Sequence, residues 1–295
     1  MEARQLEYFL AVVDRGGVNR AAQALHLAQP SLSQAIRSLE RDLGTTLFDR
    51  VGRRVVLTEA GRALVEPARQ VMRGMQSARA SVDSVAGLAT GRVEIAAMPS
   101  QSVEPFSSMI SRFTEKHPGV LVTVRAAFTA SVVIEMVRGG VTELGLLGSR
   151  EPVTGIGVVI TPITRQRFVL VTPPEGPFPS GVPVRHEQLA GQRLIVGQQG
   201  TGMRQLVDDI LAAGVKARIV VESEHRETIL PLVLKGVGMA VLADSWTSLA
   251  QRAGALVLDL EPAAYLDVAL VSRPAPITPA AGAFLDVATS VGNDL

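Results

Sequence analysis

The chain has 295 residues; 47% are hydrophobic, 29 are Lys or Arg and 28 are Asp or Glu, which gives a formal net charge of +1. This length exceeds one ordinary domain and predicts two or three. There is no Cys, which excludes disulfides, thiolate zinc sites and cysteine nucleophiles. With no apolar run of 18 residues and no signal-peptide pattern at the start, we expect a cytoplasmic protein without a membrane span.

The charge is distributed unevenly along the chain. Residues 1–87 carry 12 Arg against 9 acidic residues, whereas residues 88–295 carry a slight acidic excess. A basic head on a neutral body is compatible with DNA binding, but an excess this small does not establish it.

Apolar residues recur at three- and four-residue spacing near the N-terminus and predict a helix over about 2–14, ended by Gly16 and Gly17. Asn19 is expected to cap a second helix. The residues expected to face inward from that helix are Ala21, Ala22 and Leu25.

A third helix follows a tight turn. Pro30 suits its first turn, Ser31 and Gln34 fit a capping box, and Gly44 is expected to end it. One face is predicted to be buried, with Leu32, Ile36, Leu39 and Leu43. The opposite face carries Ser33, Gln34, Arg37 and Arg41. A helix with one apolar face and one hydrogen-bonding face is suited to the DNA major groove.

The next segment predicts a hairpin. A short strand after Leu47 and Phe48 is followed by a turn at 51–54 and a returning strand over 55–57. Three arginines surround its tip: Arg50, Arg53 and Arg54. The order of elements indicates an all-α head completed by a wing, that is, a winged helix-turn-helix.

A long helix is expected from Thr58 to about Leu88. Its apolar residues are spaced alternately by four and three residues over about three heptads: Leu64, Ala68, Val71, Met75, Ala78, Val82 and Val85. Such a seam favours pairing with a second chain. Packing along the chain's own C-terminal domain is the alternative.

After Gly91 strands and helices alternate. Strands are predicted near 92–98, 120–128, 144–148, 167–172, 194–197, 218–222, 239–244 and 267–273, with helices between most of them and a last helix over 279–291. This alternation indicates α/β layers with mostly parallel sheets. Phe128 and Trp246 are expected in the core.

The chain resembles the LysR-type transcriptional regulators over its whole length. The segments that carry the resemblance are AAQALHLAQPSLSQAIRSLERDLGTTLFDR from Ala21, LTEAG from Leu57, RFTEKHPGVLVTV from Arg112, GVTELGLLG from Gly140 and KGVGMAVL from Lys235.

This resemblance implies a winged helix-turn-helix DNA-binding domain at 1–58 and a linker helix at 59–89 that pairs two chains. It also implies a periplasmic-binding-protein-like α/β effector domain at 90–295, with subdomain I at about 92–161 and 267–295 and subdomain II at about 162–266. The expected partners are double-stranded promoter DNA, a small-molecule effector and further copies of the chain in a dimer or tetramer, with RNA polymerase as a further candidate. No cofactor is implied.

The candidate base-facing residues are Gln29, Pro30, Ser31, Ser33 and Gln34. Arg37 can reach a guanine or a phosphate, and the hairpin arginines can contact the DNA backbone or minor groove. Ser31 and Gln34 could instead serve only as local caps, and the hairpin arginines could belong to an ordinary solvated turn.

Strand ends followed by helix starts predict the effector site, because open α/β sheets bind ligands beyond the carboxyl ends of their strands. The candidates are Ser100, Gln101, Thr129, Gly148, Thr201, Gly202 and His225. Hydroxyls and free N–H groups at helix starts suit an anion, so a small anionic effector is the hypothesis. Ser100 and Thr201 could instead be plain N-caps.

Enzyme chemistry finds no support in the sequence. The four histidines lack metal-ligand spacing, no GxSxG motif is present, and the glycine-rich segment at 197–202 lacks the Lys-Ser/Thr of a phosphate-binding loop. We therefore predict no catalytic residue and no metal site. Two alternatives remain: a stand-alone small-molecule-binding protein and an α/β enzyme with a fused DNA-binding head.

Overall fold

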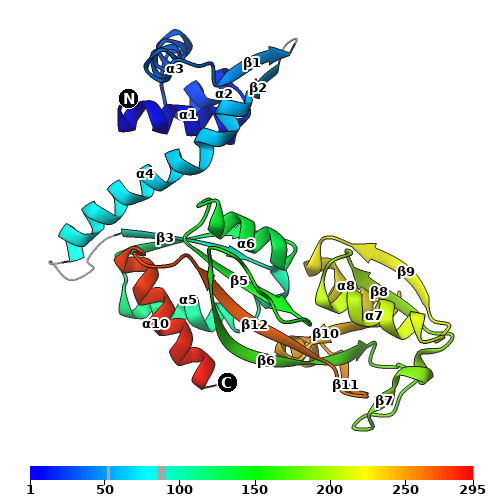
Figure 1. Ribbon diagram of the computed structural model, residues 1–295. Coiled ribbons are helices and arrows are strands. Elements are labelled where there is room, and N and C mark those ends of the chain that lie inside the picture. Colours follow the sequence, from blue (N-terminus) through cyan, green and yellow to red (C-terminus); the bar gives the residue numbers. More distant parts are fainter. Residues whose placement is uncertain (52–53, 85–90, 295) are drawn as a thin grey trace. The chain divides into compact units, whose positions relative to one another are not determined.

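The computed structural model describes residues 1–51, 54–84 and 91–294 (Figure 1). It forms two compact units, one built on Met1–Gly87 and the other on Leu88–Arg138 and Thr142–Leu295. Among the helices of the described ranges, none is long and apolar enough to cross a membrane.

The first unit is a three-helix head with a hairpin and a long helix. Its elements are α1 (Ala3–Arg15), α2 (Val18–Ala24), α3 (Gln29–Leu43), β1 (Phe48–Val51), β2 (Arg54–Leu57) and α4 (Glu59–Ser84). Phe9 from α1, Leu32 and Leu39 from α3 and Leu47 before β1 are almost completely buried in one core. This core fixes α3 against α1 and α2, as the predicted winged helix-turn-helix requires.

Three predictions for the helices of the head are wrong, two of them about N-caps, whereas the predicted glycine stops are right. The glycine stops are confirmed, because Gly16 and Gly44 adopt left-handed φ angles of 64° and 68°. However, α2 begins at Val18, so Asn19 lies inside the helix instead of capping it. The backbone leaves the extended conformation at Ala28, so Ser31 is already inside α3 and the predicted capping box does not form.

The third correction concerns the apolar stripe of α3. Leu32, Ile36 and Leu39 are buried, but Leu43 is 37% exposed. Leu43 is the last residue of α3, next to the left-handed Gly44, and takes no part in the core of the head.

The long helix α4 has two parts with different surroundings. Its first half packs on the head through Leu64 and Ala68, and Arg69 forms an ion pair of 2.7 Å with Asp14 of α1. Farther along, Val71 and Met75 are 44% and 40% exposed. The side chain of Val82 and all of Val85, the last members of the predicted seam, lie outside the described residues.

The first half of the second unit is a sheet between helices. Its elements are β3 (Gly91–Ala97), α5 (Phe106–Lys116), β4 (Val120–Ala126), α6 (Ala130–Arg138), β5 (Leu144–Ser149), β12 (Tyr265–Ser272) and α10 (Pro279–Asn293). The strand order is β4-β3-β5-β12, followed by β6 (Val159–Thr172). Phe113 of α5 and Phe284 of α10 lie in one hydrophobic cluster with the sheet, whereas Val133 of α6 belongs to another, so helices cover both faces.

The second half continues from β6. Its further elements are β7 (Val184–Arg185), β8 (Arg193–Gly197), α7 (Gly202–Ala212), β9 (Arg218–Ser223), α8 (Ile229–Leu234), β10 (Ala240–Ala243), α9 (Thr247–Arg252) and β11 (Leu256–Glu261). Strand β6 pairs with β12 up to Arg167 and with β10 and β11 from Phe168 onward. Strand β6 therefore exchanges its partners within one eight-stranded sheet, several residues after the subdomain boundary that the sequence suggests.

The expectation of mostly parallel sheets is wrong where the two halves join. Strands β3, β4 and β5 are parallel, but β12 is antiparallel to β5 and β6, and β10 and β11 are antiparallel to β6. The long strand β6 runs through both halves of one eight-stranded sheet, and β12, β10 and β11 are antiparallel to it. This sheet is therefore mixed, whereas β8 and β9 form a separate parallel pair.

Of the two aromatic residues expected in the core, one is not there. Trp246 is 7% exposed, as predicted, but Phe128 is 42% exposed. Strand β4 ends at Ala126, and Ala127 takes the buried position in the turn that leads to α6. Phe128 therefore projects from a strand end and does not pack within the sheet.

Candidate functional site

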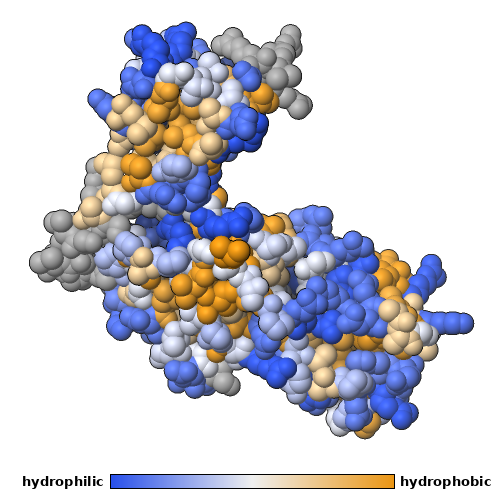
Figure 2. Space-filling model, viewed as in Figure 1, coloured by the Kyte–Doolittle hydropathy of each residue, from blue (hydrophilic) through white to orange (hydrophobic). Residues whose placement is uncertain are grey.

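The polar face of α3 forms the first candidate site. Gln29, Pro30, Ser31, Gln34 and Arg37 are exposed and Ser33 is half-buried. Gln29 donates a hydrogen bond of 2.8 Å from Nε2 to Oγ of Ser33, one turn along the helix. Figure 2 shows hydrophilic and near-neutral residues over this helix. The sequence-predicted residues thus share one accessible surface.

A hollow extends this surface toward the hairpin. It is lined by Gln34, Arg37, Glu40, Arg41, Gly44, Thr45 and Thr46. Oε1 of Glu40 accepts hydrogen bonds from the backbone N–H groups of Leu47, at 2.8 Å, and Phe48, at 3.3 Å. These bonds hold the start of β1 against α3, so Glu40 positions the hairpin. Two exposed hydroxyls that the sequence did not single out, those of Thr45 and Thr46, also lie here.

The hairpin carries the remaining DNA-binding candidates. Arg50 lies on β1 opposite Val55, and Arg54 lies on β2 opposite Val51. Arg53 lies outside the described residues, so its role stays a prediction from the sequence.

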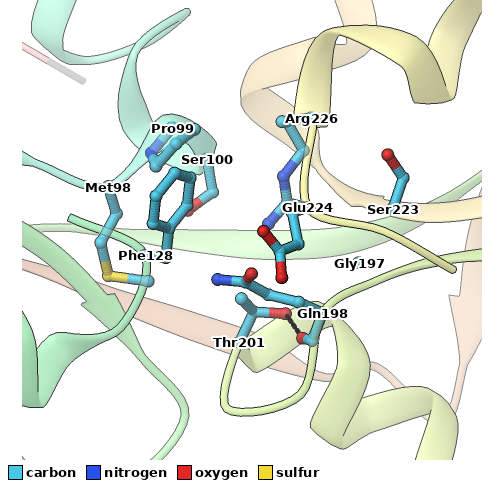
Figure 3. A pocket seen from close by; sticks show the side chains of 10 residues that line it. All are labelled: Met98, Pro99, Ser100, Phe128, Gly197, Gln198, Thr201, Ser223, Glu224 and Arg226. Carbon is cyan, nitrogen blue, oxygen red and sulfur yellow. Dashed lines mark hydrogen bonds between the residues drawn. The ribbon is translucent and has the colours of Figure 1, made fainter. Parts of the chain in front are cut away.

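In the second unit, the ends of four strands meet around a small pocket (Figure 3). One wall follows β3 and β4 and contains Met98, Pro99, Ser100 and Phe128. The other wall follows β8 and β9 and contains Gly197, Gln198, Thr201, Ser223, Glu224 and Arg226. The pocket therefore lies between the two halves of this unit, at the carboxyl ends of strands, as the sequence predicted for a ligand site.

A second small pocket shares Ser100 and Arg226 with the first. Its other lining residues are Gly148, Phe168, Gly202, Met203, Ala243, Trp246 and Leu266. Trp246 donates a hydrogen bond of 3.4 Å from Nε1 to the backbone oxygen of Ser100, which connects the two walls. The two pockets together combine apolar rings with a few polar groups, which is typical of sites for small molecules.

The hydroxyl groups predicted to bind an effector have partners within the protein. Thr201 Oγ1 donates to the backbone oxygen of Gln198 at 2.9 Å and accepts from the N–H of Arg204 at 3.4 Å, so it caps α7. Ser100 Oγ donates to Oε1 of Gln101 at 2.6 Å. Thr129 accepts from the N–H of Val132 at the start of α6. The capping role foreseen for Thr201 is therefore present, although it still lines the pocket.

The two glycines among the candidates are required by close packing. A Cβ atom on Gly148 would lie 2.5 Å from Nε2 of Gln101, and one on Gly202 would lie 2.6 Å from Cδ1 of Leu266. Gln101 itself is completely buried, and its Nε2 has no hydrogen-bond partner among the described residues. A side chain at either glycine would therefore clash with these neighbours.

Three candidates are not among the residues that line these two pockets: Gln101, Thr129 and His225. His225 is strongly exposed and lies 3.3 Å from Glu227 through Nδ1. Their roles toward an effector stay predictions.

Three residues that line the pocket were not predicted from the sequence: Phe128, Glu224 and Arg226. Phe128 was assigned to the core, and neither charged residue belongs to a motif. The available signal was position, since Glu224 and Arg226 directly follow β9 and open a short 3-10 helix (Arg226–Thr228) at the edge where the other strands end.

Arg226 is the unusual residue of this site. It is 8% exposed, and Nη1 lies 2.9 Å from the thioether sulfur of Met203. Burial lowers the pKa of its guanidinium to about 10, because the charged form is poorly solvated there. The group is still charged at neutral pH. Across the described part of the chain, no group of three or more His, Asp or Glu side chains is arranged to hold a metal ion.

Comparison with known proteins places both units in families. The family of bacterial regulatory helix-turn-helix proteins of the LysR type matches residues 3–62, and the LysR substrate binding domain matches residues 86–292. The RuBisCO operon transcriptional regulator of Allochromatium vinosum is 28% identical over 292 residues, which cover 97% of this chain and 95% of the relative.

Two solved structures have a similar fold. A full-length OxyR variant from Pseudomonas aeruginosa matches with a TM-score of 0.76 and 22% identity, over 99% of this chain and 95% of that one. Full-length CbnR in complex with its target DNA matches with a TM-score of 0.69 and 21% identity, over 99% of this chain and 100% of that one. Together with the family matches, these findings show that the chain belongs to the LysR family and is a DNA-binding transcriptional regulator with an effector-binding domain.

Proposed function

We propose that this LysR-family regulator reads promoter DNA with the exposed face of α3, contacts the flanking backbone with the hairpin, and pairs with a second copy through α4. We further propose that a small anionic effector, bound in the pockets of the second unit, controls this activity. The division that we propose is a DNA-binding domain at 1–58, a linker helix at 59–89 and an effector domain at 90–295.

One observation carries the DNA-binding part of the proposal. Leu32 and Leu39 are completely buried on one side of α3, while Gln34 and Arg37 are exposed on another. The major groove admits a helix, where Gln can pair with adenine and Arg with guanine or a phosphate. The similar fold of CbnR, which was solved with its target DNA, supports the same use of the head.

The arginines of the hairpin supply contacts of a different kind. Arg50 and Arg54 lie on the two strands near its tip, and Arg53 follows between them in the sequence. Arginines at this place suit phosphates or a narrow minor groove, which position the protein without reading the sequence directly.

Helix α4 offers the surface for pairing. The seam residues Val71, Met75 and Ala78 are exposed on α4. Burying such apolar residues against the same residues of a second copy stabilises a dimer. A dimer presents two recognition helices, which suits an operator with two half-sites. Dimers could assemble further into tetramers.

The effector part of the proposal is supported by the chemistry of the pockets. The buried Arg226 and the start of α7 both favour negative charge, and the walls come from two halves of one unit. An effector that binds better to one relative arrangement of these halves shifts the population toward it. Through the paired chains, this shift changes how the two heads engage DNA.

The DNA-binding proposal is tested by fluorescence anisotropy with the DNA upstream of the protein's own gene, titrated at several salt concentrations. We expect a preference of about 1,000-fold or more over random-sequence DNA and an affinity that falls steeply with salt. Arg37→Ala should weaken binding, whereas Arg252→Ala, which removes the same charge from exposed α9 in the second unit, should not.

No preference for any genomic fragment over random DNA, with or without metabolites, would refute the regulator proposal. The effector part is tested separately by thermal-shift and calorimetric screening of organic acids. A screen in which only neutral or cationic metabolites raise the melting temperature would contradict an anionic effector.

A further inference from the structure

A third pocket of the second unit is much larger than the two already described and shares no lining residue with them. Its volume is about 420 Å³, which lies within the usual range for sites that bind small molecules. Its walls come from β6, β11, α9 and the loop before β7. We call it the side pocket.

The side pocket lies on the opposite face of β6 from the second small pocket. Successive side chains of a strand point to opposite faces. Phe168 lines the second small pocket, whereas its neighbours Arg167 and Val169 line the side pocket. Arg167 is also the last residue of β6 that pairs with β12, and Phe168 is the first that pairs with β10. The side pocket is therefore a separate site, beside the segment where β6 exchanges partners.

One wall of the side pocket is a row of hydrogen-bond acceptors. Asp244, Thr247 and Gln251 all line it. They follow one another at three- and four-residue spacing along a short 3-10 helix (Asp244–Trp246) and α9, which places them on one helix face. Among the described residues, the hydroxyl of Thr247 and the side-chain amide of Gln251 have no hydrogen-bond partner. Three side-chain groups that can accept a hydrogen bond thus face one volume.

The charges in the side pocket do not balance. Nη1 of Arg167 forms an ion pair of 3.0 Å with Oδ2 of Asp259, and Nη2 donates to the backbone oxygen of Leu260 at 3.3 Å. Asp244 accepts a hydrogen bond of 3.0 Å from the backbone N–H of Arg167, but it takes part in no ion pair within the described ranges. Asp244 therefore gives the side pocket one negative charge that no cation of the described residues neutralises.

The rest of the lining is mainly apolar. Val169 and Val257 lie on β6 and β11, and Val182 and Pro183 come from the loop before β7. Val182 is 51% exposed, so a hydrocarbon group packed against it would remove apolar surface from water. A complementary occupant has a positive end with several hydrogen-bond donors and an aliphatic remainder.

We propose that the side pocket binds a small aliphatic amine in its protonated form. An alkylammonium group has one charge and up to three N–H donors, which match Asp244, Thr247 and Gln251, and it is charged at pH 7. The hydrocarbon chain lies against Val182 and Val257. This site is additional to the proposed effector site, and it does not depend on the regulator proposal.

The test is thermal unfolding of the full-length protein at pH 7 and constant ionic strength, titrated with butylamine hydrochloride. We expect a saturable rise in the melting temperature of the second unit, by about 3 °C at about ten times the Kd. 1-Butanol has the same chain without the charge, and tetramethylammonium has the charge without an N–H donor. Neither should produce a saturable rise.

Four variants assign the response to residues. Asp244→Asn keeps an acceptor for the N–H of Arg167 but removes the charge, and Val182→Arg places a cation at a half-exposed position of the lining. Both should abolish the rise, and two different replacements guard against a folding defect in either one. Asp286→Asn, which removes the same charge from an exposed position on α10, is the matched control and should keep the rise. Arg226→Met, in the other two pockets, should also keep it.

The inference is overturned if butylamine produces no rise, or if the rise persists in a folded Asp244→Asn or Val182→Arg protein. A saturable rise with 1-butanol or tetramethylammonium, or a rise that disappears in Asp286→Asn or Arg226→Met, overturns it as well. Specific binding of the same wild-type sample to its upstream DNA is a separate measurement. The regulator proposal therefore stands or fails independently of the amine response.

Discussion

The two candidate sites hold their charged groups in opposite environments. On the head, Gln34 and Arg37 are exposed on α3, and the apolar residues beneath them form the core. In the second unit, Arg226 is almost fully buried between two walls, and no carboxylate of the described residues lies within ion-pair distance of its guanidinium group. The functional groups of the head are exposed to water, whereas the guanidinium group of Arg226 in the second unit is almost fully buried.

This difference has consequences for stability. An exposed polar face does not oppose folding, so substitutions on it change binding and leave stability nearly unchanged. A buried unpaired charge opposes folding, so its removal stabilises the free protein, and a ligand that neutralises it has a large influence on conformation. The head is therefore expected to recognise DNA as a rigid surface, and the second unit to respond to its ligand.

The largest expected effect comes from breaking the head's core beneath its exposed face. Phe9→Ala removes a completely buried ring that packs near Phe48, with ring centres 5.4 Å apart. We expect the head to lose about 3–5 kcal/mol of unfolding free energy and all specific DNA binding. Calorimetry should show an unchanged transition for the second unit. Tyr8→Ala, next to it but only half-buried, is the milder control, and equal losses in both variants would contradict this account.

The next substitution is expected to stabilise the protein, whereas most substitutions destabilise it. Arg226→Met should raise the unfolding free energy of the ligand-free second unit by about 1–3 kcal/mol, because it removes the unpaired charge. Arg204→Met should lower it, because Asp208 and Glu222 lose their partner. Denaturant unfolding of both variants in acid-free buffer measures the difference. A destabilised Arg226→Met protein would mean that Arg226 is structural.

The pH dependence of the same comparison follows from the pKa of Arg226. Its folded-state pKa is lowered to about 10, so the destabilisation is fully present wherever the group is charged and is relieved only as the pH rises above about 10. The stability difference between wild type and Arg226→Met should therefore be constant between about pH 6 and 9. A stability difference that changes steadily with pH within this range would show that another ionisable group is responsible for it.

The same contrast between the two regions explains what the sequence could predict. The helices of the head could be predicted from periodic apolar residues and from glycine stops, which are local signals. The exposed face of α3 could be predicted with them, because it consists of the residues that lie between the apolar positions. The capping predictions for Asn19 and Ser31 were wrong because a cap depends on where the backbone leaves the extended state, here at Gly17 and Ala28.

The pocket depends on contacts between segments that are distant in the sequence. Phe128 was placed in the core because it follows an apolar strand, and nothing local shows that this strand ends two residues earlier. Arg226 is an unremarkable arginine in the sequence, since its burial requires the residues after β3 and β8 to close around it. The sequence could therefore predict that the strand ends form a ligand site, but it could not predict that the charge of Arg226 is buried there.

A smaller effect is expected on the exposed side. Arg37→Ala should weaken operator binding by about 1–3 kcal/mol, roughly 5- to 150-fold, because one base or phosphate contact is lost. Its melting temperature should equal that of the wild type, since Arg37 is exposed and has no ion-pair partner in the described residues. Anisotropy titrations at several salt concentrations distinguish the two kinds of contact. A reduced salt slope indicates a phosphate, and relaxed preference at one base pair indicates a base.

The smallest effect concerns the hydrogen bond between Gln29 and Ser33 at the start of α3. A side-chain pair one turn apart on an exposed helix stabilises it by only about 0.2–0.5 kcal/mol, so Gln29→Ala should hardly change the melting temperature. If the bond serves to orient Ser33 toward DNA, Gln29→Ala and Ser33→Ala should reduce preference at the same base pair, and the double variant should lose no more than one of them. Additive losses at different base pairs would show that each side chain contacts DNA independently. In both cases the effect would be on binding and not on folding, which is the behaviour that separates this surface from the buried pocket.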